Sequence, residues 1–312
     1  MKPRILLTGK NGQVGRDLER ILAHSSKLLA LGRQELDLTS WESIRRVIRH
    51  FQPQVIINAA AYTAVDQAES DEAAARAVNS EAPGVMAEEA RRIGAALVHY
   101  STDYVFDGLK TDSYKEDDPT NPINVYGKTK LAGEHGIQNV GGLYLIFRTA
   151  WVYSTQGRNF LLTILRLAAE REELRIVADQ VGAPTWSREI ARATAQIILE
   201  EWERCRGAVP FSKSSGIYHM TAAGQSTWWE FANAIIEEVG HAPDGVGWIT
   251  AATNGRPPVV KRISPIATKD YPTAARRPAY SVLSNARLQQ IFGIRLRDWR
   301  TQLRAAVANA QA

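Results

Sequence analysis

Tyr126 and Lys130 are the two side chains of this sequence whose types and spacing best suit proton transfer. They are four positions apart, so on a helix they lie one turn from each other on the same face. An isolated tyrosine has a pKa of about 10, and a nearby cation favours its ionised form. We therefore predict that Lys130 lowers the pKa of Tyr126, which acts as a general acid or base. The spacing alone is weak evidence, because both residue types are common on helix surfaces.

A second reactive group lies in the segment Ser101-Thr102-Asp103, which follows the apolar residues 95–100. In an open α/β sheet, the carboxyl ends of the strands face the crevice in which ligands bind. An ordinary turn or helix cap could use the same three residues. The position at a predicted strand end favours a hydroxyl that reaches the ligand crevice.

The glycines Gly9, Gly12 and Gly15 follow the apolar residues 5–7 and precede a helical pattern of apolar residues. This spacing allows a tight turn, a close approach of the backbone to a pyrophosphate, and close packing of the next helix on the sheet. Together with the tyrosine–lysine pair, the motif indicates an enzyme that uses a nicotinamide dinucleotide.

Strand-like and helix-like segments alternate through the first half of the chain, which is typical of an α/β fold with a doubly wound parallel sheet of the Rossmann type. The predicted strands cover residues 4–7, 28–31, 55–58, 95–101 and 143–148, and the predicted helices cover residues 12–23, 40–51, 81–93 and the segment that carries Tyr126 and Lys130. The stretch 108–124 is polar and reads as a long loop beside the site, where it could shape the substrate pocket.

The second half has a looser pattern, with helices predicted over residues 159–170, 187–202, 227–239 and 298–308. We predict a dinucleotide-binding domain over residues 1–150 and a mainly substrate-binding lobe over residues 151–312. This smaller C-terminal lobe is interleaved with segments that complete the sheet. Trp151 follows a predicted strand end and is a candidate ligand for the substrate, whereas Trp228 and Trp229 are expected to pack in the core.

Composition limits the function classes without selecting one. The chain has 312 residues, 45% hydrophobic and 23% charged, and one cysteine, Cys205, which excludes an internal disulfide. No apolar stretch approaches the roughly 20 residues of a membrane span, and residues 1–4 do not resemble a signal peptide, so we expect a cytoplasmic protein without membrane contact. The net charge of +5 is spread along the chain, so nucleic-acid binding is not expected. Basic pairs at 261–262 and 276–277 could meet an anionic diphosphate.

Four ordered motifs carry a family resemblance. They cover residues 9–15 (GKNGQVG), 58–66 (NAAAYTAVD), 101–108 (STDYVFDG) and 125–134 (VYGKTKLAGE). The chain resembles the extended short-chain dehydrogenases/reductases, and within them the dTDP-4-dehydrorhamnose reductases. Further matches at 147–153, 179–185 and 277–283 extend the resemblance over nearly the whole chain.

The resemblance implies that NADPH or NADH delivers a hydride to C4 of a 4-keto sugar carried on dTDP. Tyr126 would protonate the new alkoxide, Lys130 would hold the nicotinamide ribose, and Thr102 would bind the reacting oxygen. The implied substrate contacts are Thr102, Asp103 and Trp151. The implied or predicted cofactor contacts are Gly9, Gly12, Gln13, Val14 and Gly15 at the pyrophosphate, Asp37 and Leu38 at the adenine side, and Ala61, Tyr62 and Thr63 at the ribose and phosphate region, with Tyr126 and Lys130.

The end of the second strand bears on the choice between the two dinucleotides. Arg33 stands where NAD-preferring folds often carry an acidic residue, and a guanidinium suits the 2′-phosphate of NADP. We therefore expect NADPH to be used at least as well as NADH, although Glu35 lies nearby.

Related families supply alternatives. Dehydratases of nucleotide sugars place two acidic residues after the same threonine, whereas Tyr104 follows Asp103 here, which favours plain reduction. Epimerases use a similar hydroxyl, tyrosine and lysine set. The regulatory subunit of methionine adenosyltransferase is a non-catalytic binding protein with similar motifs, and an NADPH oxidation assay would separate it from an enzyme.

Metal binding is not expected. The six histidines have no metal-ligand spacing, and Arg188 occupies the position at which some relatives carry an acidic ligand for a magnesium ion that bridges a dimer. We predict a metal-independent protein, monomer or homodimer, without a metal-bridged interface.

Overall fold

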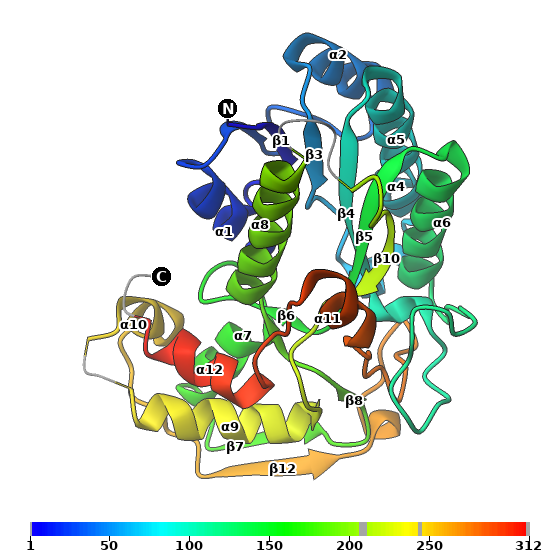
Figure 1. Ribbon diagram of the computed structural model, residues 1–312. Coiled ribbons are helices and arrows are strands. Elements are labelled where there is room, and N and C mark those ends of the chain that lie inside the picture. Colours follow the sequence, from blue (N-terminus) through cyan, green and yellow to red (C-terminus); the bar gives the residue numbers. More distant parts are fainter. Residues whose placement is uncertain (1, 206–210, 243–244, 310–312) are drawn as a thin grey trace.

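A six-stranded parallel sheet forms the centre of the computed structural model, which describes residues 2–205, 211–242 and 245–309 (Figure 1). The strand order is β10-β5-β4-β3-β1-β2, and every neighbouring pair is parallel. The strands are β1 (Arg4–Thr8), β2 (Lys27–Leu31), β3 (Val55–Asn58), β4 (Ala96–Thr102), β5 (Leu143–Thr149) and β10 (Gly216–His219). The central strands β3 and β4 are buried along their whole length, because helices cover both faces of the sheet.

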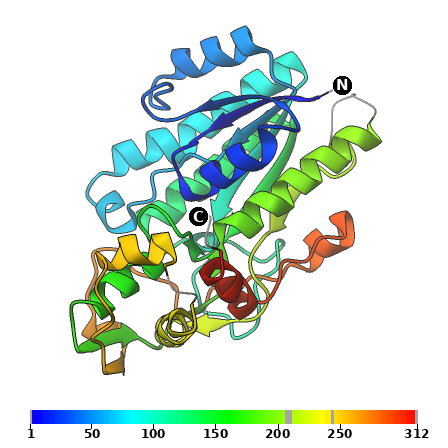
Figure 2. The same ribbon diagram turned by 90° about the vertical axis from the view of Figure 1, so that its left-hand side faces the viewer.

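Two helical layers cover the sheet. The helices α1 (Gln13–Leu22) and α8 (Ser187–Arg204) pack together on one face, which Figure 2 turns toward the viewer. On the other face lie α2 (Trp41–Phe51), α5 (Ala82–Ile93) and α6 (Val125–Val140). Short helices α3 (Val65–Ala68) and α4 (Glu72–Arg76), followed by a π-helical segment (Ala77–Glu81), lead into α5, and a 3₁₀ turn (Asp103–Val105) follows β4.

A smaller lobe lies beyond the carboxyl ends of the strands (Figure 1). Its core is formed by aromatic and aliphatic side chains of α7 (Phe160–Ala168), α9 (Trp228–Gly240), α10 (Gly247–Thr253) and α12 (Trp299–Val307). Three two-stranded pairs join it: β12 (Arg262–Ile266) with β7 (Glu173–Val177), β8 (Val181–Gly182) with β11 (Ser226–Thr227), and β6 (Val152–Tyr153) with β9 (Thr185–Trp186). A 3₁₀ turn (Thr268–Asp270) and the helix α11 (Ala286–Phe292) complete the described elements.

The chain passes repeatedly between the sheet and this lobe. It leaves the sheet after β5, returns through α8 to place β10 at the sheet edge, and crosses again to α9. The predicted doubly wound parallel sheet is confirmed, and the domain boundary at residue 150 stays a prediction. Among the helices of the described residues, none is long and apolar enough to cross a membrane, and the cytoplasmic location also stays a prediction.

Candidate active site

The glycine loop between β1 and α1 is shaped so that only hydrogen fits at two of its positions. Gly9 has φ +77°, and a Cβ on it would lie 2.6 Å from the Ala60 nitrogen. A Cβ on Gly15 would lie 2.0 Å from the Gly9 carbonyl oxygen. Gln13 begins α1, and its buried Oε1 has no hydrogen-bond partner among the described residues. A tight loop at a helix N-terminus with an unused buried acceptor fits a dinucleotide pyrophosphate and its neighbouring hydroxyls.

The predicted adenine side lies at the end of β2. Arg33 is exposed, and Leu38 is buried beneath this edge. Glu35 accepts a hydrogen bond from the Gly32 nitrogen at 2.8 Å and pairs with Lys10 of the glycine loop. The backbone N–H and the hydroxyl of Thr39 hold the pKa of the Asp37 carboxyl below its usual value. Of the two cations named here, Lys10 is paired with Glu35, so the exposed Arg33 guanidinium is the one left to meet a ligand.

The residues after β3 are fixed by one asparagine. The Asn79 side chain accepts from the Tyr62 nitrogen at 2.9 Å and donates to the Tyr62 carbonyl oxygen at 3.1 Å. The Tyr62 hydroxyl donates to Asp71 at 3.2 Å. These bonds position the half-buried Ala61 and Tyr62 and the exposed Thr63 beside the glycine loop, whose Gly9 lies against Ala60.

Tyr126 lies in the first turn of α6. Asn124 caps this helix by accepting from the Gly127 nitrogen at 2.7 Å, and a Cβ on Gly127 would lie 2.2 Å from the Tyr104 carbonyl oxygen. The helix start therefore presses against the end of β4. There the Thr102 hydroxyl lies beside the Tyr126 phenol, and the Tyr104 ring packs edge-on against the Tyr126 ring at 5.6 Å.

The predicted effect of Lys130 on the Tyr126 pKa is wrong. Burial raises the pKa of Tyr126 to about 12, with the Thr102 hydroxyl opposing the shift. The Lys130 amino group has its hydrogen-bond partners elsewhere. It donates to the Tyr100 carbonyl oxygen at 2.6 Å and lies 3.1 Å from His99 Nε2. Tyr126 is consequently protonated at neutral pH, as a general acid must be before it donates.

Asp103 is a buried carboxyl that directly follows Thr102 at the end of β4. Its Oδ1 accepts from the Thr102 hydroxyl at 3.0 Å. Burial raises the pKa of Asp103 to about 6, although the Ser281 and Thr102 hydroxyls oppose the shift. Oδ2 is buried without a hydrogen bond of ordinary geometry among the described residues. A buried carboxylate oxygen without such a hydrogen bond can accept one from a ligand hydroxyl or amide.

Trp151 stands between the sheet and the lobe in a strained backbone conformation, with φ 48°. Its ring stacks on Trp228 at 3.5 Å with an interplanar angle of 4°, and a Cβ on Gly182 would lie 2.4 Å from it. Trp228 also packs against Phe160, so the expected core packing of Trp228 holds for one side of its ring. The other side of the Trp228 ring stacks on Trp151, a contact that the sequence did not predict.

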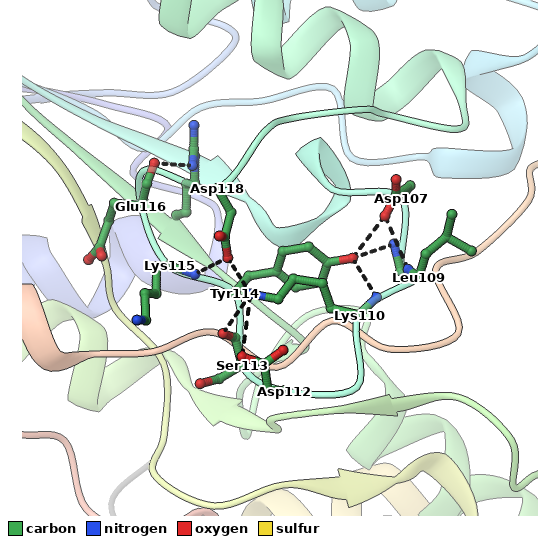
Figure 3. Close-up of polar contacts among 11 residues, drawn as sticks. Asp107, Leu109, Lys110, Asp112, Ser113, Tyr114, Lys115, Glu116 and Asp118 are labelled. Atoms are coloured by element: carbon green, nitrogen blue, oxygen red, sulfur yellow. Dashed lines mark hydrogen bonds and ion pairs between the residues drawn. The ribbon is translucent and has the colours of Figure 1, made fainter.

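The polar loop between β4 and α6 is organised around the buried Tyr114 (Figure 3). Its hydroxyl donates to Asp107 at 2.9 Å and accepts from the backbone nitrogens of Gly108 at 3.0 Å and Lys110 at 3.3 Å. Lys110 pairs with Asp118 at 2.7 Å across the same loop. The loop predicted over residues 108–124 is thus ordered by the hydrogen bonds of the Tyr114 hydroxyl.

The two basic pairs have different surroundings. Lys261 pairs with Glu172, and Arg262 with Glu173, on the exposed β7–β12 ribbon, so both cations are engaged by carboxylates away from the crevice. Arg277 forms a two-pronged pair with Asp66, with both distances 2.6 Å, and carries the C-terminal segment to the residues after β3.

A buried ion pair that the sequence did not reveal joins β5 to α6. Arg148 of β5 binds Glu134 of α6, with 2.7 Å between Nη2 and Oε2 and 3.0 Å between Nε and Oε1. Ser101 of β4 donates to the same carboxylate. The three elements that carry or flank Thr102, Tyr126 and Lys130 are therefore joined by one carboxylate.

The predicted set is therefore brought together only in part. Thr102, Asp103 and Tyr126 share the end of β4, and Lys130 lies one turn deeper. Trp151 follows β5, the neighbour of β4, and the glycine loop follows β1 on the other side of β3. Arg188 lies over the Trp186 ring, and the described part of the chain holds no group of three or more His, Cys, Asp or Glu side chains arranged for a metal ion.

Comparison with known proteins identifies the family. The model of the RmlD substrate binding domain family matches residues 1–312. A protein of Burkholderia thailandensis named dTDP-4-dehydrorhamnose reductase is 52% identical over 298 residues, which cover 95% of each chain. The chain belongs to the dTDP-4-dehydrorhamnose reductase family.

Solved structures agree with this membership. The dTDP-4-dehydrorhamnose reductase of Bacillus anthracis, crystallised in complex with NADP, superposes with a TM-score of 0.85 and 31% identity over 98% of each chain. A UDP-glucose 4-epimerase of Thermus thermophilus shares the fold at 20% identity, with a TM-score of 0.75 over 97% of each chain. Members of the dTDP-4-dehydrorhamnose reductase family thus match this chain from end to end.

Proposed function

We propose that this protein reduces the C4 keto group of dTDP-4-dehydro-L-rhamnose to dTDP-L-rhamnose, with NADPH or NADH as the reductant. The observation that carries the proposal is the junction of Thr102, Asp103 and Tyr126 at the end of β4, beside buried Lys130. The family membership supports the same reaction, since the most similar relatives named above are dTDP-4-dehydrorhamnose reductases.

The dinucleotide would supply the hydride that reaches C4. Tyr126 then donates its phenolic proton to the oxygen that becomes a hydroxyl, and its raised pKa keeps that proton in place until the oxygen gains negative charge. Thr102 holds the same oxygen beside the phenol. Lys130 donates to the nicotinamide ribose from its buried position, and Asp103 and Trp151 contact the sugar nucleotide.

The dinucleotide contacts follow the strand ends. Gly9, Gly12, Gln13, Val14 and Gly15 line the pyrophosphate, where a side chain at Gly15 would fill the cradle. Asp37 and Leu38 lie at the adenine side, and Ala61, Tyr62 and Thr63 at the ribose and phosphate region. Arg33 contacts the 2′-phosphate of NADPH, because it is exposed while Lys10 is held by Glu35.

The direct test is the purified protein with dTDP-4-dehydro-L-rhamnose and each reduced dinucleotide. We expect loss of the reduced-dinucleotide absorbance that requires the keto sugar, with NADPH at least as efficient as NADH. Thr102→Val should lower turnover while NADPH affinity stays nearly unchanged, because its hydroxyl contacts Asp103, Tyr126 and the substrate oxygen in this proposal, but not the dinucleotide. If the protein binds NADPH but turns over no keto sugar, the reductase proposal fails and a non-catalytic binding role replaces it.

A further inference from the structure

A buried polar chain runs from the glycine-loop strand to the site lysine. The Thr8 hydroxyl donates to Asn58 Oδ1 at 2.8 Å, Asn58 Nδ2 lies 3.1 Å from His99 Nδ1, and His99 Nε2 lies 3.1 Å from Lys130 Nζ. All four side chains are buried, and they come from β1, β3, β4 and α6. The proposed reaction uses Lys130 but gives no role to Asn58 or His99.

The direction of this chain is fixed by a backbone group. The Ala60 N–H lies 3.2 Å from Asn58 Oδ1, and a backbone N–H can only donate. The amide oxygen of Asn58 must therefore face Ala60, which leaves the amide NH₂ to face His99. His99 Nδ1 accepts that hydrogen bond, so the proton of the neutral imidazole must be on Nε2.

His99 does not take a second proton, which would make both ring nitrogens donors. Burial lowers its pKa well below the usual value, and the nearby Lys130 lowers the pKa further. Its Nε2–H therefore points at Lys130 Nζ. An ammonium has three donors and no lone pair, whereas a neutral amine has a lone pair that can accept. The amino group still donates to the Tyr100 carbonyl oxygen in either state.

We propose that Asn58 and His99 are positioning residues for Lys130, which hold a hydrogen-bond donor against its amino group and so favour the neutral amine over the ammonium. The inference concerns a residue of the proposed reductase site. The hydrogen-bond argument does not depend on the proposed reduction, and only its meaning for the reaction rests on that proposal. The charge of Lys130, and with it the grip on the nicotinamide ribose, would then change close to physiological pH.

The other titratable groups near Lys130 do not cancel this effect. Burial lowers the pKa of Lys130 to about 8, while Glu134, one turn along α6, favours the ammonium. Glu134 is itself paired with Arg148 of β5, which weakens its pull. On α6 the Tyr126 phenol is protonated, and in the 3₁₀ turn after β4 the Asp103 carboxyl accepts from the Thr102 hydroxyl.

On the remaining elements, Asn58 of β3 is uncharged, and the Tyr100 hydroxyl of β4 donates to Thr194 of α8 at 2.7 Å. The hydrogen-bond donor of His99 and the burial of Lys130 therefore both favour the neutral amine of Lys130.

The first experiment asks which nitrogen of His99 carries the proton in the wild-type protein. Nitrogen chemical shifts of the ¹⁵N-labelled imidazole distinguish a protonated ring nitrogen from a bare one, and His99→Gln assigns the signals by their loss. We expect Nε2–H with a bare Nδ1 from neutral to alkaline pH. A protonated Nδ1 in the wild type would overturn the proposal without any mutant having to fold.

Asn58→Asp reverses the direction of the hydrogen bonds that run from residue 58 through His99 to Lys130, with almost no change in side-chain shape. The carboxylate still accepts from Ala60 and Thr8, but it now also accepts from His99, so the imidazole proton should move to Nδ1 and Nε2 should accept from the Lys130 ammonium. We expect the pH midpoint above which NADPH affinity falls to rise by about one unit or more. Tyr100→Phe is the matched control, since it removes the hydrogen bond to Thr194 from the same strand and should leave the tautomer and the midpoint unchanged.

The outcomes separate the two proposals. An Asn58→Asp protein that is folded but keeps the wild-type tautomer or midpoint contradicts the role of Asn58 and His99. Neither the imidazole shifts nor NADPH affinity requires turnover of a keto sugar, so both readouts remain valid if the proposed reduction itself fails.

Discussion

At the scale of single residues, the site combines two groups whose pKa values are raised by burial. The Tyr126 phenol stays protonated at neutral pH, and the Asp103 carboxyl loses its proton at a higher pH than a free aspartate does. Tyr126→Phe keeps the ring and its edge-on packing against Tyr104, but it removes the donated proton. Turnover should fall by roughly 10²- to 10⁴-fold, the usual contribution of a positioned general acid, while the unfolding midpoint and NADPH affinity stay near those of the wild type. Steady-state kinetics and NADPH titration measure the split.

Tyr104→Phe is the control for loss of a phenolic hydroxyl beside the same crevice, and it should retain most of the turnover. An undiminished rate for Tyr126→Phe would remove Tyr126 from the chemistry.

Asp103 allows a prediction about pH and stability. Its pKa is about 6 in the folded protein against 3.8 for the free side chain, so at neutral pH the folded state holds an ionised carboxyl that burial disfavours. Well below pH 3.8 the carboxyl is protonated in both states and has no effect on stability. As the pH rises from 3.8 to about 6, the unfolded state ionises first, and the folded state loses about 3 kcal/mol of stability relative to it.

Asp103→Asn should therefore be more stable than the wild type above pH 6 and about equally stable at pH 4. Urea unfolding at both pH values tests this difference. Turnover should fall at the same time, because the buried Oδ2 that we assign to the substrate becomes an amide nitrogen. A stability gain of equal size at both pH values would contradict the assigned pKa.

At the scale of elements, β4, β5 and α6 share the buried Glu134 carboxylate. Removing one partner of a buried pair leaves the other charge without compensation, at a cost of about 3–5 kcal/mol. Glu134→Gln should destabilise the protein by this amount, because Arg148 is 3% exposed and keeps its charge. Glu134→Leu combined with Arg148→Met should recover much of the loss. Chemical denaturation of Glu134→Leu, of Arg148→Met and of the double variant gives the coupling, and additive losses would show that the pair is not a unit.

The β4–α6 loop makes a separate prediction. Tyr114→Phe removes one hydroxyl that serves the Asp107 side chain and the backbone N–H groups of Gly108 and Lys110. Leaving such groups unsatisfied costs about 1–3 kcal/mol, so the loop should open more often. Hydrogen exchange should accelerate over residues 107–118, and KM for the sugar nucleotide should rise more than kcat falls. Lys110→Met, which breaks the partly exposed pair with Asp118, is the control and should change both little.

The sequence predicted elements well where an apolar pattern was long or clearly bounded. The strand at 55–58 and the helices at 40–51 and 227–239 agree with β3, α2 and α9 to within one residue at each end. The short strands β7, β10 and β12 were not predicted, because their partners lie far away in the sequence and a run of four or five residues has no decisive period. The π-helical segment Ala77–Glu81 was also not predicted, since the predicted helix begins only at residue 81.

At the site, residue types were readable from the sequence but their hydrogen-bond partners were not. Lys130 was expected beside the Tyr126 phenol from helix spacing alone. Its amino group instead contacts the Tyr100 carbonyl oxygen and His99. These groups of β4 lie beside Lys130 only because α6 packs on β4. The Trp151–Trp228 stack likewise joins residues from two separate passes of the chain.

At the scale of the whole molecule, segments that return late in the chain contact the residues around the site. Arg277 reaches Asp66, and Asn124 Nδ2 donates to the Arg276 carbonyl oxygen at 2.8 Å. These contacts tie the C-terminal segment to α3 and to the start of α6, beside the proposed catalytic residues. The C-terminal segment is thus held against two segments that flank the proposed catalytic residues.

The same scale holds the prediction on metal dependence. The helix α8 begins near the lobe, and Arg188 in its first turn lies 5.7 Å from the centre of the Trp186 ring. The neighbouring Glu189 is already paired with Arg192 and with Arg297. A guanidinium at this position repels a divalent cation, and a carboxylate held by two arginines is poorly placed to bind one. We therefore expect activity and oligomeric state to be unchanged by EDTA, measured by turnover and by light scattering after size-exclusion chromatography. Arg188→Glu should leave turnover without metal near that of the wild type, and dissociation or inactivation of the wild type by EDTA, reversed by added magnesium, would show that a metal ion is part of the assembly.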